Sequence, residues 1–170
     1  MLRKVSVLRK GALQRGEKVN EEFGKLVNQL PHLLEQLVSS AALDRSKSRR
    51  LPKRGTYVFY EGGKALYVGR SNRMKDRILE HGRPSSHRYS ATFAFRLAKE
   101  AAKQKGIDLG KTGAQLEEDA AFVDLFSQAR ERVSGMSVRA VEIKGAIGQT
   151  LFEVYAALEL KTPHNDFDSH

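Results

Sequence analysis

Two tyrosines and an arginine–histidine pair have the types and spacing of groups that could do chemistry together. Tyr57 and Tyr67 lie ten residues apart, and Arg77 and His81 follow them four residues apart. Residues four apart on a helix share one face. There an arginine can present its planar guanidinium to a phosphate, with the histidine at the same centre. Taken singly, they could instead be ordinary strand tyrosines, a surface arginine whose stem covers apolar neighbours, and a histidine whose charge favours a helix C-terminus.

Glu153 is a fifth candidate because its carboxylate lies within the apolar run 151–158. A carboxylate in such a run should face solvent or have a partner. A divalent metal is such a partner, since Mg²⁺ is typically held by one or two carboxylates and keeps several waters. Glu142 and Glu159 are also candidates, and spacing alone does not separate the three.

A β-hairpin must position the two tyrosines. The runs 56–60 and 64–69 are rich in β-branched and aromatic residues, and Glu61-Gly62-Gly63 lies between them. A two-residue Gly62-Gly63 turn would place Tyr57 opposite Val68 and turn Tyr67 to the other face. A three-residue loop would place Tyr57 opposite Tyr67, with both phenols on one face. Catalysis by both tyrosines requires the second register, so we predict the three-residue loop.

Periodicity and capping signals predict the other elements. The predicted helices cover residues 19–41, where Pro31 kinks or divides the helix, Ser71 or Asn72 to about His81, 91–105, 114–133 and 146–160. A polar linker is predicted over 44–54 and a strand over 137–143. Thr112 and Gln115 fit a capping box at the start of the helix over 114–133.

The predicted fold is α/β, with a small antiparallel sheet of three strands (56–61, 64–69 and 137–143) flanked by helices. Residues 1–50 are expected to form a basic, helical N-terminal extension. Residues 51–170 are expected to form one domain with a helical insertion around 91–133.

Composition points to a polyanionic partner. The 170-residue chain has a net charge of +10, and residues 1–110 hold 24 of its 30 lysines and arginines. Residues 1–16 contain five cations and no acid, which indicates a basic arm; a transit peptide is the alternative. The chain has no cysteine, which excludes disulfides and thiolate metal sites. It has no membrane-length apolar run, so we expect no membrane partner and a cytoplasmic location.

The candidate residues together resemble the GIY-YIG nuclease family. Gly55-Thr56-Tyr57 resembles its first triplet and Tyr67-Val68-Gly69 its second, followed by Arg77 and His81. The resemblance covers about residues 54–168 and includes Glu153 and Asn165. Threonine and valine replace the isoleucine at the middle of the two triplets, so the functional positions are retained. Walker loops, Gly-x-Ser-x-Gly and two-histidine zinc motifs are not present in the sequence.

The resemblance implies a metal-dependent endonuclease. Glu153 would bind Mg²⁺ or Mn²⁺, and Tyr57 would be the general base. Tyr67 would position water or phosphate, and Arg77 would stabilise the pentavalent phosphorane. His81 would orient Tyr57 or accept its proton. The supporting residues are Gly69, which would allow close backbone approach or end the strand, and Asn165, which would hold the C-terminal tail or make a bond behind the reacting groups.

The implied partner is double-stranded DNA. We expect its backbone to contact a set of cations around the motifs: Arg45, Lys47, Arg49, Arg50, Lys53, Arg54, Arg70, Arg73, Arg83 and Arg88. A type II restriction enzyme is the favoured role, and it would imply a homodimer if the recognised site is palindromic. The alternatives are a repair or mobile-element nuclease of the same family, a non-catalytic DNA-binding module, and a basic RNA-associated or ribosome-associated protein.

Overall fold

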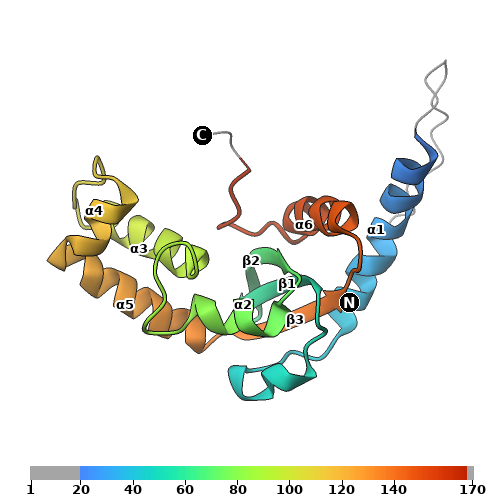
Figure 1. The fold of residues 1–170 in the computed structure, drawn as a ribbon, viewed down its shortest axis with the longest axis horizontal. Coiled ribbons are helices and arrows are strands. Elements are labelled where there is room, and N and C mark those ends of the chain that lie inside the picture. Colours follow the sequence, from blue (N-terminus) through green and yellow to red (C-terminus); the bar gives the residue numbers. More distant parts are fainter. Residues whose placement is uncertain (1–19, 168–170) are drawn as a thin grey trace.

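The computed structural model describes residues 20–167, and the basic arm expected at residues 1–16 lies outside them. The described chain has an α/β fold, in which helices flank a three-stranded antiparallel sheet (Figure 1). This confirms the predicted fold class. None of the helices in this part of the chain is long and apolar enough to cross a membrane.

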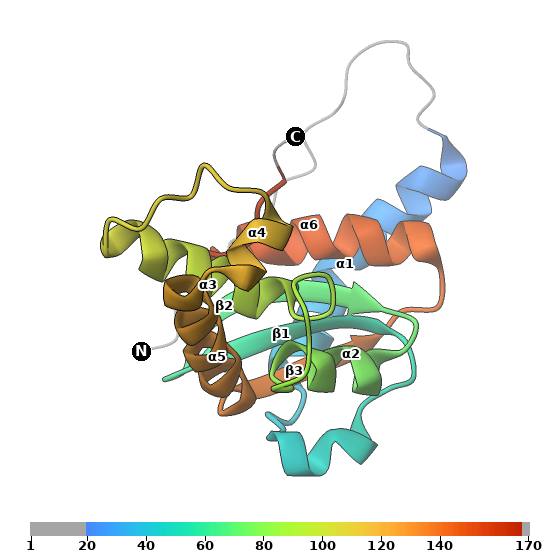
Figure 2. The same ribbon diagram turned by 60° about the vertical axis from the view of Figure 1, so that its left-hand side comes forward.

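The sheet has the strand order β2-β1-β3. Its strands are β1 (Gly55–Glu61), β2 (Lys64–Ser71) and β3 (Ser137–Glu142). Figure 2 shows them side by side, with β1 in the middle. The central strand is rich in β-branched and aromatic residues, which suit a pleated surface buried on both faces.

The hairpin turn has two residues, so the predicted three-residue loop is wrong. Glu61 pairs with Lys64, and between them Gly62 and Gly63 have φ values of 56° and 79°. Two consecutive positive φ angles define the turn type that matches the twist of a hairpin, and glycine adopts them without strain.

The predicted pairing of Tyr57 with Tyr67 is also wrong, but the two phenols still share a face. The register shifts between Phe59 and Tyr60, where Leu66 is inserted as an extra residue in β2. As a result Phe59 lies opposite Tyr67, and Tyr57 lies opposite Gly69. Because side chains alternate along a strand, the bulge returns Tyr67 to the face that Tyr57 occupies.

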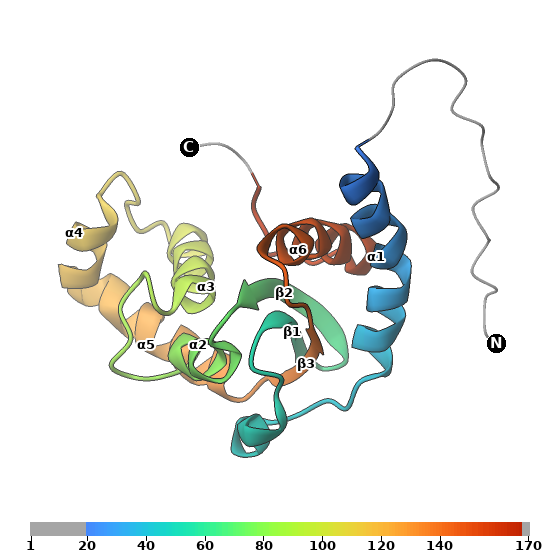
Figure 3. The same ribbon diagram turned by 45° about the vertical axis from the view of Figure 1, so that its right-hand side comes forward.

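Two layers of helix cover the sheet, as Figure 3 shows. Helices α1 (Glu21–Ser39) and α6 (Ala146–Leu160) pack on the face that carries Val58 and Val68. The other face is covered by α2 (Met74–His81), α3 (Thr92–Gln104) and α5 (Ala120–Ser134). Helix α1 contributes to the core, since its Leu37 is fully buried.

Three local predictions differ from the structure. One helix runs through Pro31, so the proline does not divide it. The polar linker predicted over residues 44–54 contains a 3-10 helix, η1 (Arg45–Arg50). The helix expected over 114–133 is two helices, because Asp119 leaves the helical conformation and its side chain accepts hydrogen bonds from the first N–H groups of α5.

The capping box at Thr112 is confirmed. It opens the short helix α4 (Gly113–Glu118), and the Thr112 hydroxyl and the Gln115 side chain each accept a hydrogen bond from the other residue's backbone. The chain from α3 to α5 therefore forms a helical lobe at one end of the sheet (Figure 1).

Candidate active site

Tyr57 and His81 form the centre of the candidate site. The Tyr57 hydroxyl lies 2.9 Å from Nε2 of His81, which is the last residue of α2. Tyr57 is 1% exposed and His81 is fully buried. A polar pair that is this deeply buried is stable only when each group satisfies the other. The sequence predicted this convergence, and the bulge in β2 leaves it intact.

The second nitrogen of His81 determines where the ring carries its proton. Nδ1 accepts a hydrogen bond from the Phe93 N–H, over 3.4 Å. This N–H belongs to the first turn of α3, where backbone donors have no partner within the helix. Burial and the Arg77 charge lower the pKa of His81 well below its usual range, so the ring is neutral at pH 7. A neutral ring with an accepting Nδ1 is protonated at Nε2, and His81 therefore donates to Tyr57.

Gly69 is required by the position of Tyr57. A Cβ atom at this glycine would lie 2.5 Å from the Tyr57 hydroxyl oxygen. Two roles were open for Gly69, close approach or the end of the strand. Since β2 continues to Ser71, close approach is the role that the structure supports.

Arg77 is fixed beside the two tyrosines. Its guanidinium donates to the Ser90 carbonyl over 2.7 Å, to the Tyr89 carbonyl over 3.2 Å and to the Thr92 hydroxyl over 2.9 Å. It also makes a hydrogen bond with Tyr57 that lowers the pKa of the phenol. A guanidinium held by four groups is pre-organised, and its side chain is still 21% exposed.

Thr92 is a site residue that the sequence analysis missed. Its hydroxyl accepts from Arg77 and also makes a hydrogen bond with Tyr67. The Tyr67 ring stacks on Phe93, with ring centroids 4.7 Å apart. The start of α3 therefore orients both groups. The sequence predicted a helix here but contained no signal that its first residues face the tyrosines.

Glu153 lies on α6, which packs on the other face of the sheet. Its carboxylate accepts a hydrogen bond from Arg70 Nε over 2.9 Å. Its charge raises the pKa of Tyr57 and of Tyr67, which places it within electrostatic reach of both. The two alternative glutamates are poorer candidates for the metal ligand. Glu142 is exposed at the end of β3, and Glu159 is exposed and raises the pKa of Tyr155 rather than that of Tyr57.

The charges around Tyr57 oppose loss of its proton. Burial raises the pKa of Tyr57 far above its usual value, and the neighbouring Tyr67 and Glu153 raise it further. Arg77 is the group that lowers it. Burial likewise raises the pKa of Glu153, against the effect of Arg70. Burial thus disfavours the ionised forms of both Tyr57 and Glu153, and an added cation would favour them.

The donor set fits a hydrated divalent ion better than a fully protein-coordinated one. Among residues 20–167, no group of three or more His, Asp or Glu side chains could hold a metal. Glu153 alone is a suitable ligand for Mg²⁺, which keeps several waters and is commonly bound by one or two carboxylates. The half-buried carboxylate with its raised pKa is the observation that fits such an ion.

Asn165 lies behind the reacting groups and holds the C-terminal segment on the sheet. Its carboxamide accepts from the Val68 N–H over 2.8 Å and donates to the Val68 carbonyl over 2.9 Å. The His164 N–H donates to the Leu66 carbonyl in the same way. Of the two roles expected for Asn165, the structure supports the first, because the residue pairs with the free edge of β2.

The cations expected to contact DNA differ in whether their side chains form ion pairs within the protein. Several are paired with acids: Lys47 with Asp44, Arg70 with Glu153, Arg73 with Asp76 and Glu80, and Arg88 with Glu117. Others are exposed: Arg49, Arg50, Lys53, Arg54 and Arg83. Arg45 begins η1. A cleft of about 340 Å³ joins η1 to the start of α2, and of these cations Arg49, Lys53 and Arg73 line it.

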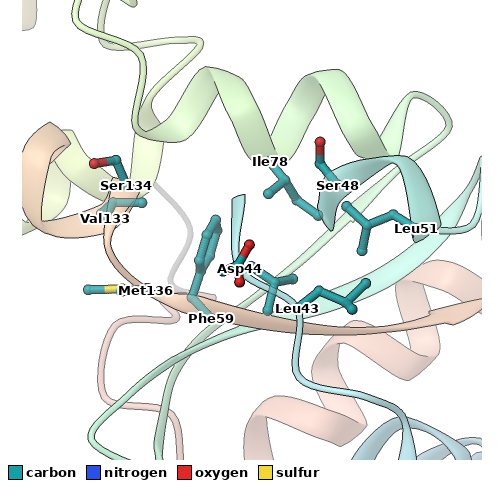
Figure 4. A pocket seen from close by; sticks show the side chains of 10 residues that line it. Leu43, Asp44, Ser48, Leu51, Phe59, Ile78, Val133, Ser134 and Met136 are labelled. Carbon is teal, nitrogen blue, oxygen red and sulfur yellow. The ribbon is translucent and has the colours of Figure 1, made fainter. Parts of the chain in front are cut away.

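The small cavity under η1 is not a second site. Leu43, Leu51, Phe59 and Ile78 are among its lining residues (Figure 4), and its volume is about 10 Å³. That is roughly the space of one water, and its lining is mainly apolar. It is a packing defect between η1, α2 and the sheet.

No family model matches the chain, and no significant match exists for it among the curated proteins or the solved structures. Any assignment of function therefore depends on the residues and the geometry described above.

Proposed function

We propose that this protein is a metal-dependent endonuclease that hydrolyses phosphodiester bonds in double-stranded DNA, as its resemblance to the GIY-YIG nucleases implies. One observation supports this most strongly. The hydrogen bond between Tyr57 and His81 is buried. Arg77 bonds the same phenol and lowers its pKa, whereas the charge of Glu153 raises it. A binding module has no need to bury a tyrosine–histidine pair beside a carboxylate.

Tyr57 is the proposed general base, and His81 assists it as a hydrogen-bond donor. Two roles were open for His81, orienting Tyr57 or accepting its proton. The Nε2–H tautomer favours the first, because a donating nitrogen cannot also take the proton. Since Arg77 and His81 both donate to the Tyr57 oxygen, both stabilise the phenolate as it forms. Tyr57 must first lose its own proton to solvent. The phenolate oxygen then accepts a proton from the attacking water and returns to the neutral phenol.

Arg77 stabilises the charge of the phosphorane, and Tyr67 positions water or phosphate through the bond that it shares with Thr92. Glu153 would hold Mg²⁺ or Mn²⁺, which would supply positive charge against the negative charge that develops on the phosphate and the leaving oxygen.

The alternative with an observation in its favour is a non-catalytic DNA-binding module. Arg70 already pairs with Glu153, so an ion pair could satisfy this carboxylate without any metal. The RNA-associated alternative accounts for the net charge but gives no reason for the buried pair.

Cleavage of supercoiled plasmid tests the proposal, with Mg²⁺, with EDTA, and with the Glu153→Ala variant. Glu159→Ala is the matched control, because Glu159 is an exposed glutamate on the same helix. We expect cleavage that requires both Mg²⁺ and Glu153 and that persists in Glu159→Ala. Discrete fragments would favour a restriction enzyme, and nicking or smearing would favour a repair or mobile-element nuclease. DNA binding without any cleavage would overturn the nuclease in favour of the binding module.

A further inference from the structure

A groove of about 560 Å³ extends along α3. It begins beside the candidate site and leads away from it. The loop before α3 forms one wall and the C-terminal segment around residues 163–166 forms another. Figures 1 and 3 show this segment passing between α6 and α3. Phe95 and Leu109 contribute apolar surface to the groove, and four basic and two acidic side chains line it.

The groove is connected to the site at one end. Thr92 lines the groove, and its hydroxyl is bonded to Arg77 and Tyr67. Asn165 lines it as well, while its carboxamide is bonded to the edge of β2. Thr92 therefore links the lining of the groove directly to the Arg77 guanidinium.

Two of the basic side chains in the groove are available for a ligand. Arg88 pairs with Glu117, and Arg96 lies 3.7 Å from Asp166. Lys99 and Lys103 form no ion pair with any residue of the described chain. They are four residues apart, so their ammonium groups lie along one face of α3. At a rise of 1.5 Å per residue, Lys99 is about 10 Å and Lys103 about 16 Å along the helix from Thr92.

Tyr89 stands at the mouth of the groove. It is 69% exposed, which is unusual for a large aromatic side chain. The guanidinium of Arg88 lies 4.4 Å from the ring centroid and donates to the Tyr89 hydroxyl over 3.2 Å. The ring is thus held in place while much of its surface faces solvent.

We infer that this groove binds an unpaired nucleic-acid strand next to the scissile phosphate, with phosphates on Lys99 and Lys103 and one base stacked on Tyr89. A cationic groove with an exposed aromatic ring is the usual means of binding single strands, because every base has a flat face. A duplex hides those faces within its stack and would leave Tyr89 without a partner. The inference rests on the proposed nuclease function, and it implies a preference for duplex DNA that carries a single-stranded tail.

Fluorescence anisotropy in EDTA tests the inference without cleavage. The probes are a fluorescein-labelled 20-base-pair duplex and the same duplex with a six-nucleotide tail, made in both polarities. We expect one tailed probe to bind the native protein at least tenfold more tightly than the blunt duplex. Tyr89→Ala should lose about fivefold to hundredfold of that affinity, and Tyr89→Phe should retain it.

The two lysines are tested by salt dependence. With Lys99 and Lys103 both changed to alanine, the slope of log affinity for the tailed probe against log salt should fall by about 1.4. A variant with Lys25→Ala and Lys64→Ala loses the same charge from exposed sites outside the groove and should keep the native slope.

The results separate the two proposals. Equal affinity for tailed and blunt probes, or no effect of Tyr89→Ala, would refute single-strand binding by the groove and leave the proposed nuclease activity unaffected. Selective tail binding without plasmid cleavage would support single-strand binding and refute the nuclease activity. Failure to bind any DNA overturns both.

Discussion

The two faces of the sheet come from the same strands but are built from different side chains. On the α1–α6 face, β1 and β2 contribute Val58 and Val68 to a mainly aliphatic layer. On the α2–α3–α5 face, the same strands contribute Tyr57, Phe59 and Tyr67 to an aromatic layer that encloses His81. The first face stabilises the fold. The second has buried polar groups that are satisfied mainly by one another.

This difference shows how a site can be kept ready for chemistry. A buried valine is stabilised by any close packing around it, whereas a buried hydroxyl or imidazole also requires a hydrogen-bond partner at a suitable distance and angle. The aromatic face is therefore the less tolerant of change, and the aliphatic face should affect the reaction only through overall stability.

The largest expected effect comes from removing one oxygen atom on the aromatic face. Tyr57→Phe should lower the cleavage rate by about 10²- to 10⁴-fold, the usual contribution of a general base, while DNA affinity stays the same. Val58→Ala changes the opposite face at the neighbouring residue. It should lower the free energy of unfolding by about 2 kcal/mol and leave cleavage by the folded protein unchanged. Steady-state cleavage and urea unfolding measure the two effects, and native cleavage by Tyr57→Phe would exclude Tyr57 as the base.

Gly69→Ala should come next, because the added methyl would be 2.5 Å from the Tyr57 hydroxyl. Overpacking of this kind typically costs about 1–3 kcal/mol, and here it also displaces the phenol from His81. Thermal unfolding and cleavage should both fall. Gly135→Ala is the matched control, since this exposed residue has a φ of −85° and a ψ of −7°, which suit alanine, and an added methyl group would meet only the Arg132 carbonyl oxygen at 3.6 Å. Equal behaviour of the two variants would contradict the close approach at Gly69.

A smaller effect is expected from pH. The pKa of His81 is lowered in the folded chain, so the unfolded chain takes up this proton first, near the ordinary pKa of 6.5. Stability is therefore fully present above pH 6.5 and is lost as pH falls, by at most about 1.4 kcal/mol per pH unit. Urea unfolding between pH 7.5 and 5.5 measures the slope.

His81→Gln is the comparison that isolates this histidine. The raised pKa of Glu153 acts in the opposite direction, but the variant retains Glu153 and so retains that contribution. The fall in stability should be absent from His81→Gln. A slope that persists unchanged in this variant would show that another group titrates.

The sequence carried enough local information to predict the hairpin, the capping box and the main helices, and to single out five candidate side chains. It could not predict the register, because Leu66 is an ordinary strand residue and nothing marks it as an insertion. The role of Thr92 depends on how α3 packs against β2, and the groove depends on the position of the C-terminal segment. Both are properties of tertiary packing, which local patterns do not encode.

The bond between Asn165 and Val68 has a consequence for the chain as a polymer. The outer edge of β2 would otherwise present free N–H and carbonyl groups to a strand of another molecule, and such edges nucleate aggregation. The segment that covers this edge is also a wall of the groove. Loss of residues 162–167 would therefore expose a self-associating edge and open the proposed strand-binding surface at the same time, so that misassembly and loss of ligand capture would arise together from one short truncation.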